Sequence, residues 1–322
     1  MTPLVPTYIT KTKLPSDTNR KAFSLVELLA VIGIIGILLA LTFPAAQAVR
    51  QAARRTACLS NILQVMTATL SYETSGNGFP TADNGKGASL LVPLLPYMEQ
   101  PELEERAKIG LVAGETYNDK WGSMANTQIS ILICPATGPT ENLAELNSQG
   151  TYTTHYFGVA GPAGFAVDKN GQSFNYKELK PTPAEGPIAF QGLFGLSPNG
   201  KFRPRQFKDI LDGASNTLAY GEIAGTPPRT STRSMNRSGW AFGAKYSSSG
   251  KVTEIYGCKT VTKGINEPVG KINDVPFASN HPSGAQFAMA DGSTHFIDAS
   301  IDLDILKILS SMDGREATTP LF

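Results

Sequence analysis

One long apolar run near the N-terminus is the strongest pattern in the chain. Residues 23–43 are almost all apolar, and the stretch from Leu28 to Phe43 carries no charge. As a helix rising about 1.5 Å per residue, this run spans roughly the 30 Å hydrocarbon core of a bilayer. Its one acid, Glu27, stands near the start, where the apolar residues outweigh its insertion cost. The pattern therefore predicts one transmembrane helix over about residues 26–46.

After Pro44 the apolar pattern becomes periodic. Apolar residues recur at spacings of three and four, namely Leu59, Ile62, Leu63, Met66 and Leu70. This period is typical of a helix with one apolar stripe, which packs against the rest of a domain. A turn-forming stretch at residues 75–78 ends it. We therefore expect a helix over residues 23–72, with a membrane half followed by an amphipathic half that packs on a sheet.

Beyond residue 72 the chain alternates short apolar runs with turn residues. Its 31 glycines and 22 prolines among 322 residues favour turns and short strands over long helices. We expect strands in the runs at residues 129–134, 151–160 and 217–223, whereas two prolines interrupt the apolar run at residues 88–97. Residues 73–322 are therefore expected to form one β-rich globular domain.

The clearest local signal in this domain lies near its end. Two strand-like runs, residues 285–290 and 293–297, flank Asp291 and Gly292. Asp-Gly is the favoured two-residue hairpin turn, because Gly accepts positive φ at little cost. Residues 301–312 then predict a short helix closed by Gly314. Together with the long first helix, these elements predict an α+β fold with a mostly antiparallel sheet and many loops.

Charge argues against a nucleic-acid partner. The formal net charge is +1. The one basic cluster, formed by Arg50, Arg54 and Arg55, directly follows the apolar run. At that place arginines contact lipid headgroups of the inner membrane more readily than a phosphate backbone. We therefore expect membrane lipid, and no nucleic acid, as a partner.

Glu27 needs a partner in the membrane. Acids inside membranes are usually paired with another group. The nearest cation would be a new α-amine, if the chain were cut between Ala22 and Phe23. Residues 1–22 are polar and end in a basic stretch, as a leader requires, and we expect this leader to be disordered and cleaved.

Residues 21–29, Lys-Ala-Phe-Ser-Leu-Val-Glu-Leu-Leu, resemble the prepilin cleavage and methylation motif of type IV pilins and pseudopilins. The resemblance implies a pilin-like fold, cleavage before Phe23 by a prepilin peptidase that also N-methylates the new terminus, and a cytoplasmic N-terminus. It further implies that Glu27 pairs with the amine of a neighbouring, like or related subunit, and that Pro44 kinks the helix. The family usually has Gly before the cut, whereas this chain has Ala22.

Two other interpretations of the apolar run remain open. A basic stretch, an apolar core and the sequence Ala46-Gln47-Ala48 also fit an ordinary secretory signal. Such cores usually have about 7 to 15 residues, which is shorter than this run. A plain membrane anchor is the other alternative. Neither interpretation gives Glu27 a role.

A second resemblance comes from the C-terminal part. His281, nine further residues, then Asp291 and Gly292 are similar to the C-terminal signature of a large uncharacterised family of prepilin-like proteins. Segments at residues 94–100, 132–135, 210–217 and 221–222 resemble that family too. The likeness covers most of the chain after Lys21. It implies an architecture, but the family's own function is poorly defined.

Three cysteines are expected outside the cytoplasm, where disulfides persist. Three pairings are possible. We favour Cys58 with Cys134, because this bond would hold the helix to the sheet, and leave Cys258 free. The alternative is three reduced, buried thiols.

Catalytic and metal motifs are weak. Residues 195–201 have the glycine and lysine spacing of a P-loop, but Phe202 replaces the Ser or Thr that holds Mg²⁺, and the segment is better explained as a turn. His281, Asp291 and His295, with Glu222, form the one constellation that suits a divalent metal. The hairpin could bring His281 close to Asp291 or His295. Because the turn already explains Asp291, we expect no metal and no cofactor.

Two functions are compatible with these patterns. The favoured one is a structural prepilin-like subunit of a type IV pilus or a type II secretion-like pseudopilus, and not an enzyme. It would be a single-pass inner-membrane protein with a periplasmic or surface-exposed C-terminal domain. The alternative is a tethered envelope domain that does not polymerise and binds a ligand such as a glycan or a metal.

Overall fold

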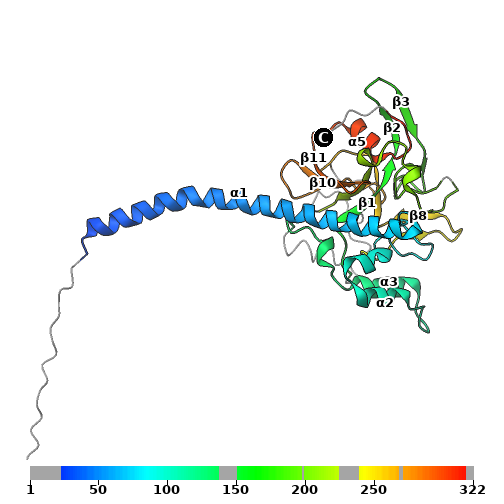
Figure 1. Ribbon diagram of the computed structural model, residues 1–322, viewed down its shortest axis with the longest axis horizontal. Coiled ribbons are helices and arrows are strands. Elements are labelled where there is room, and N and C mark those ends of the chain that lie inside the picture. The colour runs from blue at the N-terminus through cyan, green and yellow to red at the C-terminus, as the bar shows by residue number, and fades with distance from the viewer. Residues whose placement is uncertain (1–22, 138–150, 198, 225–238, 268–270, 317–322) are drawn as a thin grey trace, which may run out of the picture. The chain divides into compact units, whose positions relative to one another are not determined.

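The computed structural model describes residues 23–137, 151–197, 199–224, 239–267 and 271–316 (Figure 1). The predicted leader, including Ala22, lies outside the described residues. The chain forms two compact units, residues 1–50 and 51–322. The second half of the long helix therefore belongs to the globular unit.

The long helix α1 covers Leu25–Tyr72 without interruption at Pro44, and a π-helical turn, η1 (Glu73–Asn77), extends it. Its start is a reciprocal cap. The Ser24 Oγ accepts the Val26 N–H at 3.2 Å, and the Glu27 carboxylate accepts the Ser24 N–H at 2.9 Å. The end follows from Gly76, whose φ of 89° no helix tolerates. The predicted long helix is thus confirmed, and η1 extends it beyond residue 72.

The first half of α1 is exposed along its whole length. Every side chain from Phe23 to Ala57 is exposed, although the run is apolar up to Phe43. Among the described residues, α1 with its π-helical extension is the one helix long and apolar enough to cross a membrane. An exposed surface of Leu, Ile, Val and Phe is favourable only against lipid or other apolar helices.

The second half of α1 buries one stripe in the core of the globular unit. Its buried residues are Cys58, Ile62, Val65, Met66, Ala68 and Thr69. The predicted stripe was partly wrong, because Leu63 is 42% exposed and Val65 takes its place. Thr69 explains this rotation, since its hydroxyl shares a 2.8 Å hydrogen bond with the buried Tyr220 hydroxyl.

The remaining elements are short. The other helices are η2 (Val92–Met98), α2 (Pro101–Lys108), α3 (Tyr117–Ala125), η3 (Ser130–Leu132), η4 (Phe207–Asp209), η5 (Ala214–Asn216) and α5 (Leu303–Ser310). The strands are β1 (Tyr156–Pro162), β2 (Gly164–Val167), β3 (Ser173–Tyr176), β4 (Glu178–Leu179), β5 (Ile188–Ala189), β6 (Leu218–Glu222), β7 (Ala244–Tyr246), β8 (Val252–Ile255), β9 (Cys258–Val261), β10 (Gly284–Met289) and β11 (Thr294–Asp298).

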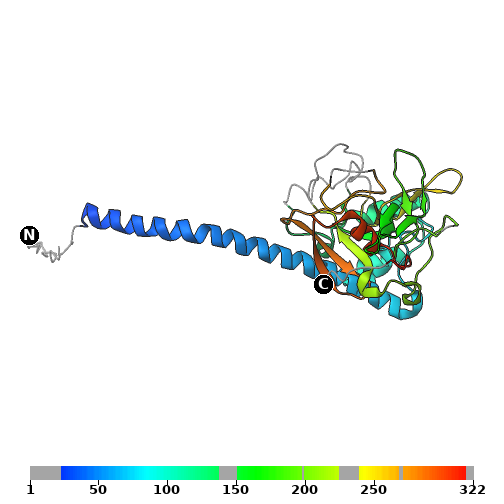
Figure 2. The same ribbon diagram turned by 90° about the horizontal axis from the view of Figure 1, so that it is seen from above.

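A five-stranded sheet in the order β11-β10-β6-β1-β9 organises the globular unit. Its pairs are antiparallel except β1 with β9, which is parallel. Three two-stranded sheets, β2-β3, β4-β5 and β7-β8, surround it. In the view of Figure 1, α5 lies near the β2-β3 hairpin at the top and α2 and α3 lie together at the bottom. Figure 2 shows the same sheet from above. The predicted α+β class with a mostly antiparallel sheet is confirmed.

One strand prediction needs correction. Residues 129–134 form no strand; they contain η3, because the Leu132 and Ile133 carbonyls accept hydrogen bonds from the His155 N–H and the Asn61 amide. The apolar run around Pro93 forms η2. By contrast, β6 agrees with the strand predicted at 217–223, and α5 falls inside the helix predicted at 301–312.

The C-terminal hairpin β10-β11 is confirmed, but its turn differs by one residue. The Met289 carbonyl accepts the Gly292 N–H at 3.1 Å, and the Met289 N–H donates to the Ser293 carbonyl at 2.8 Å. Residues 290–292 therefore form a three-residue loop, with Gly292 at φ 95°. Asp291 favours this form because its carboxylate accepts the Ser293 N–H and hydroxyl.

Gly292→Ala should destabilise the fold. A Cβ there would lie 3.0 Å from the Leu70 Cδ1 of α1, and the positive φ is itself unfavourable. We expect a loss of about 1–3 kcal/mol in the free energy of unfolding, measured by denaturant titration of the full chain in detergent. Gly171→Ala is the matched control, because its φ is 78° and its Cβ would meet nothing within 4 Å. If Gly292→Ala were the more stable of the two variants, this packing against α1 would be wrong.

Candidate functional site

The residues of the processing motif lie at the free start of α1. The Phe23 side chain is 71% exposed, and Glu27 occupies the first turn of the helix. One Glu27 oxygen accepts the Ser24 N–H, as described above. Pro44 lies within the apolar half. The roles predicted for Phe23, Glu27 and Pro44 in processing and assembly stay predictions.

A disulfide joins α1 to the rest of the globular unit. It links Cys58 to Cys134, the pairing favoured from the sequence, with Cα atoms 5.0 Å apart and 76 positions between them in the sequence. Cys258 is buried and free. In the chain-entropy account, closing a loop of this length stabilises the fold by about 4 kcal/mol.

Backbone contacts hold both cysteines in place. The Tyr156 hydroxyl donates to the Cys58 carbonyl at 3.2 Å, and the Cys134 N–H donates to the His155 Nδ1 at 2.9 Å. Tyr156 is the first residue of strand β1, which lies next to β6 in the sheet, and His155 directly precedes it. Both cysteines of the disulfide are therefore hydrogen-bonded to residues at the start of β1.

Glu222 and His281 complete a buried cluster with this disulfide. Glu222 is the last residue of β6, and Ile223 after it forms a parallel bridge with Ala278. This bridge brings the loop that carries His281 to the end of β6. The His281 Nε2 lies 3.5 Å from the Cys134 Sγ and 3.7 Å from the Glu222 Oε1.

Burial controls the protonation of both side chains. Desolvation raises the pKa of Glu222 from 4.5 to about 8, against hydrogen bonds from the Gln286 N–H and the Ser279 side chain that lower it. The Glu222 Oε1 is buried without a hydrogen-bond partner. Desolvation, and secondarily the charge of Arg55, lowers the pKa of His281. The pair is therefore neutral around pH 7, in the form that costs least to bury.

The predicted grouping of His281 with Asp291 or His295 was wrong. Among the described residues, the group able to hold a metal consists of Cys58, Cys134, Glu222 and His281. The Asp291 carboxylate accepts a hydrogen bond from the Ser293 hydroxyl within its own turn, and the His295 Nε2 lies 3.2 Å from the same hydroxyl. The hairpin therefore holds these two residues apart from the His281 loop. Of the four weighed candidates, Glu222 and His281 are brought together.

The segment that resembles a P-loop is a turn in the residues described. The Ser197 N–H donates to the Lys201 carbonyl, and the Gly200 N–H donates back to the Ser197 carbonyl. No helix follows Lys201 in the described chain until η4. The described part of the segment therefore forms a turn, as predicted, and Pro198 lies outside the described residues.

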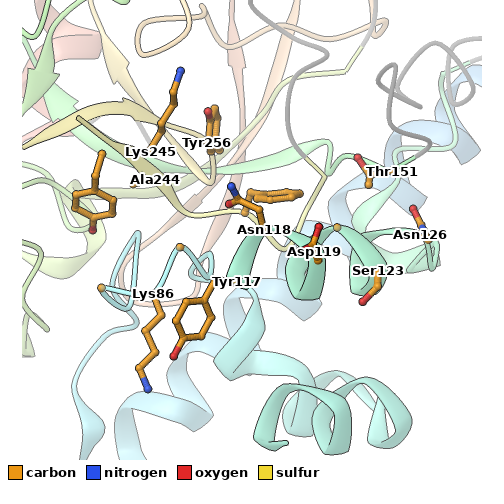
Figure 3. A pocket seen from close by; sticks show the side chains of 15 residues that line it. Lys86, Tyr117, Asn118, Asp119, Ser123, Asn126, Thr151, Ala244, Lys245 and Tyr256 are labelled. Atoms are coloured by element: carbon orange, nitrogen blue, oxygen red, sulfur yellow. The ribbon is translucent and has the colours of Figure 1, made fainter. Parts of the chain in front are cut away.

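A separate cleft of about 780 Å³ opens beside α3 (Figure 3). Its walls are the loop at residues 85–87, the start of α3 and strand β7. Figure 3 shows Lys86 beside Tyr117, and the Lys86 Nζ lies 5.9 Å from the centre of that ring. On the other wall, Lys245 is paired with Glu254 at 2.8 Å. Aromatic rings and fixed polar groups of this kind suit a polar organic ligand.

Sequence reasoning missed two features of this site. It placed Glu222 and the cysteines in separate arguments, because 88 positions separate Cys134 from Glu222 and no local pattern links them. It did not predict the cleft either, since Lys86, Tyr117 and Lys245 stand in three unrelated segments. Sequence patterns grouped Glu222 with His281 as candidate metal ligands, but they did not join this pair to the two cysteines.

Glu222→Gln should change how stability depends on pH. The folded state keeps a proton on Glu222 up to about pH 8, whereas the unfolded chain loses it near pH 4.5, so this group destabilises the fold as pH rises through that window. The His281 imidazole faces Glu222, and burial lowers its pKa below the usual value. We expect Glu222→Gln to gain on the order of 3 kcal/mol relative to the unchanged chain between about pH 5 and about pH 8, measured by denaturant titration. The exposed Glu102→Gln is the control. If the difference in the free energy of unfolding between Glu222→Gln and the unchanged chain did not depend on pH, the burial of the Glu222 carboxyl would be wrong.

Comparison with known protein families agrees with both sequence resemblances at the level of family. The family described as "Protein of unknown function (DUF1559)" matches residues 47–304, and the "Prokaryotic N-terminal methylation motif" matches residues 17–43. No curated protein and no solved structure matches the chain.

The methylation motif indicates a prepilin-like protein, which implies processing by a prepilin peptidase. With one apolar helix, it is consistent with a single-pass inner-membrane protein. The resemblance to type IV pilin-like proteins is thus confirmed, whereas the signature of His281, Asp291 and Gly292 stays a prediction. Because the match to DUF1559 spans most of the sequence, the chain belongs to that family of proteins of unknown function.

Proposed function

We propose that this protein is a structural, non-enzymatic prepilin-like subunit that is assembled into, or with, a type IV pilus or a type II secretion-like pseudopilus. Its leader is cleaved between Ala22 and Phe23 by a prepilin peptidase that also methylates the new terminus. The C-terminal domain is then displayed in the periplasm or at the cell surface, while the N-terminus starts on the cytoplasmic side.

The observation that carries this proposal is the exposed apolar half of α1 with one acid at its start. Side chains from Phe23 to Phe43 are all exposed. Such a surface supports lipid contact before assembly and contact with other helices afterwards. Gly33 and Gly36 leave open space, because a Cβ at either would meet nothing within 4 Å. Small residues of this kind allow close approach of neighbouring helices.

Glu27 supplies specificity to that helix contact. A carboxylate in the apolar phase is costly unless a cation compensates it. The Glu27 Oε2 already binds the Ser24 N–H. The α-amine created at Phe23 by cleavage, on the same or a neighbouring chain, is the cation available at this depth. Pairing to a neighbour would fix the axial position of each subunit.

A tethered ligand-binding domain is the second candidate function. The cleft beside α3 favours it, because Tyr117, Tyr246 and Tyr256 line it together with Asn118 and Asp119. Aromatic rings with amide and carboxylate groups suit a glycan. In this case the membrane half of α1 would only anchor the domain.

Charge reversal at Glu27 separates the two functions. Glu27→Lys places a cation opposite the amine, so repulsion should reduce the fraction of chain found in sheared filaments, or in crosslinked multimers, to background. Glu102→Lys is the matched control, since Glu102 is an exposed acid in the first turn of α2. It should assemble like the unchanged chain.

Two results would count against assembly through Glu27. One is normal incorporation of the Glu27→Lys chain. The other is an equal loss in the Glu102→Lys chain, which would trace the defect to folding or export. Normal localisation of Glu27→Lys with no multimers in any variant would favour the tether.

A further inference from the structure

We propose that the reduced form of this protein binds one Zn²⁺ between Cys58, Cys134, His281 and Glu222, so that the same two cysteines serve alternately as a disulfide and as metal ligands. This site is independent of the proposed assembly function. It rests on the geometry of the cluster, on its burial and on one unsatisfied carboxylate oxygen.

The four side chains converge from four segments of the globular unit. Cys58 comes from α1, Cys134 follows η3, Glu222 ends β6 and His281 lies before β10. One ligand atom from each lies within 4.8 Å of every other. Two thiolates, an imidazole and a carboxylate form a donor set that Zn²⁺ accepts in tetrahedral sites.

The distances already resemble those of such a site. Zinc lies about 2.3 Å from sulfur and about 2.0 Å from nitrogen, so tetrahedral angles set the sulfur to nitrogen separation at about 3.5 Å. The Cys134 Sγ and the His281 Nε2 are 3.5 Å apart. The His281 Nε2 and the Glu222 Oε1 are 3.7 Å apart, close to the roughly 3.3 Å expected for a nitrogen and an oxygen ligand. The two sulfurs must separate, by rupture of their bond, and the remaining ligand pairs lie within 4.8 Å.

A disulfide alone leaves Glu222 unexplained. Its side chain is fully buried, and the Oε1 has no hydrogen-bond partner. An unsatisfied buried oxygen is costly and rarely persists without a reason. This oxygen lies 3.7 Å from the His281 Nε2, which in turn lies 3.5 Å from the Cys134 Sγ. A metal ion at that point would satisfy it.

Charge and burial also suit a closed structural site. Zn²⁺ with two thiolates, one carboxylate and a neutral imidazole has a net charge of about −1 by formal count. Arg55, close enough to influence the His281 imidazole, provides a compensating positive charge. The Arg55 guanidinium stacks 3.7 Å from the centre of the Phe296 ring, which holds it near the cluster. All four ligand residues are buried, as in structural zinc sites.

The exchange between the two states balances with a dithiol reductant. The reductant is oxidised to its own disulfide and passes two electrons and two protons to the sulfurs of Cys58 and Cys134, which become thiols. On binding Zn²⁺, each thiol releases its proton, and Glu222 releases a third. The disulfide form of the same reductant reverses the process: it takes two electrons from the two thiolates and two protons from solvent, the Cys58–Cys134 bond forms again, Glu222 regains its proton and the metal is released.

The test uses the full chain in detergent, reduced with a phosphine and then exposed to Co²⁺ or Zn²⁺. We expect one metal per chain after reduction and none before it. Bound Co²⁺ should show the thiolate charge-transfer and tetrahedral d–d bands, and Zn²⁺ should displace it. His281→Ala should weaken binding by more than the roughly 10–100-fold typical of losing an outer-shell partner. The control His295→Ala should bind like the unchanged chain.

Each result either supports the zinc site or overturns it. A folded, reduced chain that takes up no metal overturns the proposal, as does equal binding by the His281→Ala and His295→Ala chains. Metal retained by the oxidised chain also overturns it, because the thiolates would then be dispensable. If reduction unfolds the chain, near-UV circular dichroism decides. Recovery of the signal on adding Zn²⁺ supports the site, and failure to recover contradicts it.

Discussion

The packing of the second half of α1 into the sheet domain is the interaction on which the rest of the structure depends. The helix is continuous, but its first half is apolar on all sides, whereas its second half is apolar along one buried stripe. Burial of Ile62, Val65 and Met66 supplies about 1.5–3 kcal/mol each. The hydroxyl contact of Thr69 with Tyr220 then fixes the rotation of the helix. Without this anchoring, the globular domain would have no defined attachment to its membrane segment.

The buried cluster is a direct consequence of that packing. Cys58 is the first buried residue of α1. Glu222, the last residue of the central strand β6, lies close to it. The disulfide, the carboxyl and the imidazole therefore mark the point where helix, sheet and the His281 loop meet. A disulfide or a metal ion at this point would hold the second half of α1 to the rest of the globular unit. The cleft beside α3 is lined by none of these residues.

Patterns that depend on neighbouring residues were predictable from the sequence. The apolar run and the amphipathic period predicted α1, although Leu63 in the predicted stripe is exposed. The Asp-Gly turn predicted the β10-β11 hairpin, although its loop is one residue longer than predicted. Residues 129–134 show the limit of local pattern. Their β-branched residues favour a strand, but the Asn61 and His155 side chains supply their hydrogen bonds and no strand pairs with them.

Sequence patterns grouped Glu222 with His281 as candidate metal ligands, but they did not show that the pair meets the Cys58–Cys134 disulfide. That meeting depends on the bridge between Ile223 and Ala278. The pairing of Cys58 with Cys134 was favoured by a structural argument, that the helix must be held to the sheet, rather than by any spacing rule. Long-range contacts of this kind follow from tertiary packing, and one sequence carries little direct record of them.

We propose that the apolar half of α1 is a processed, assembly-competent pilin-like segment. Mass spectrometry of the N-terminus of the mature protein tests this proposal. We expect a chain that begins at Phe23 with a methylated amine. A chain that begins at Val49 would instead show cleavage after an ordinary secretory signal, and one that retains Met1 would show a plain membrane anchor; either result would contradict the account.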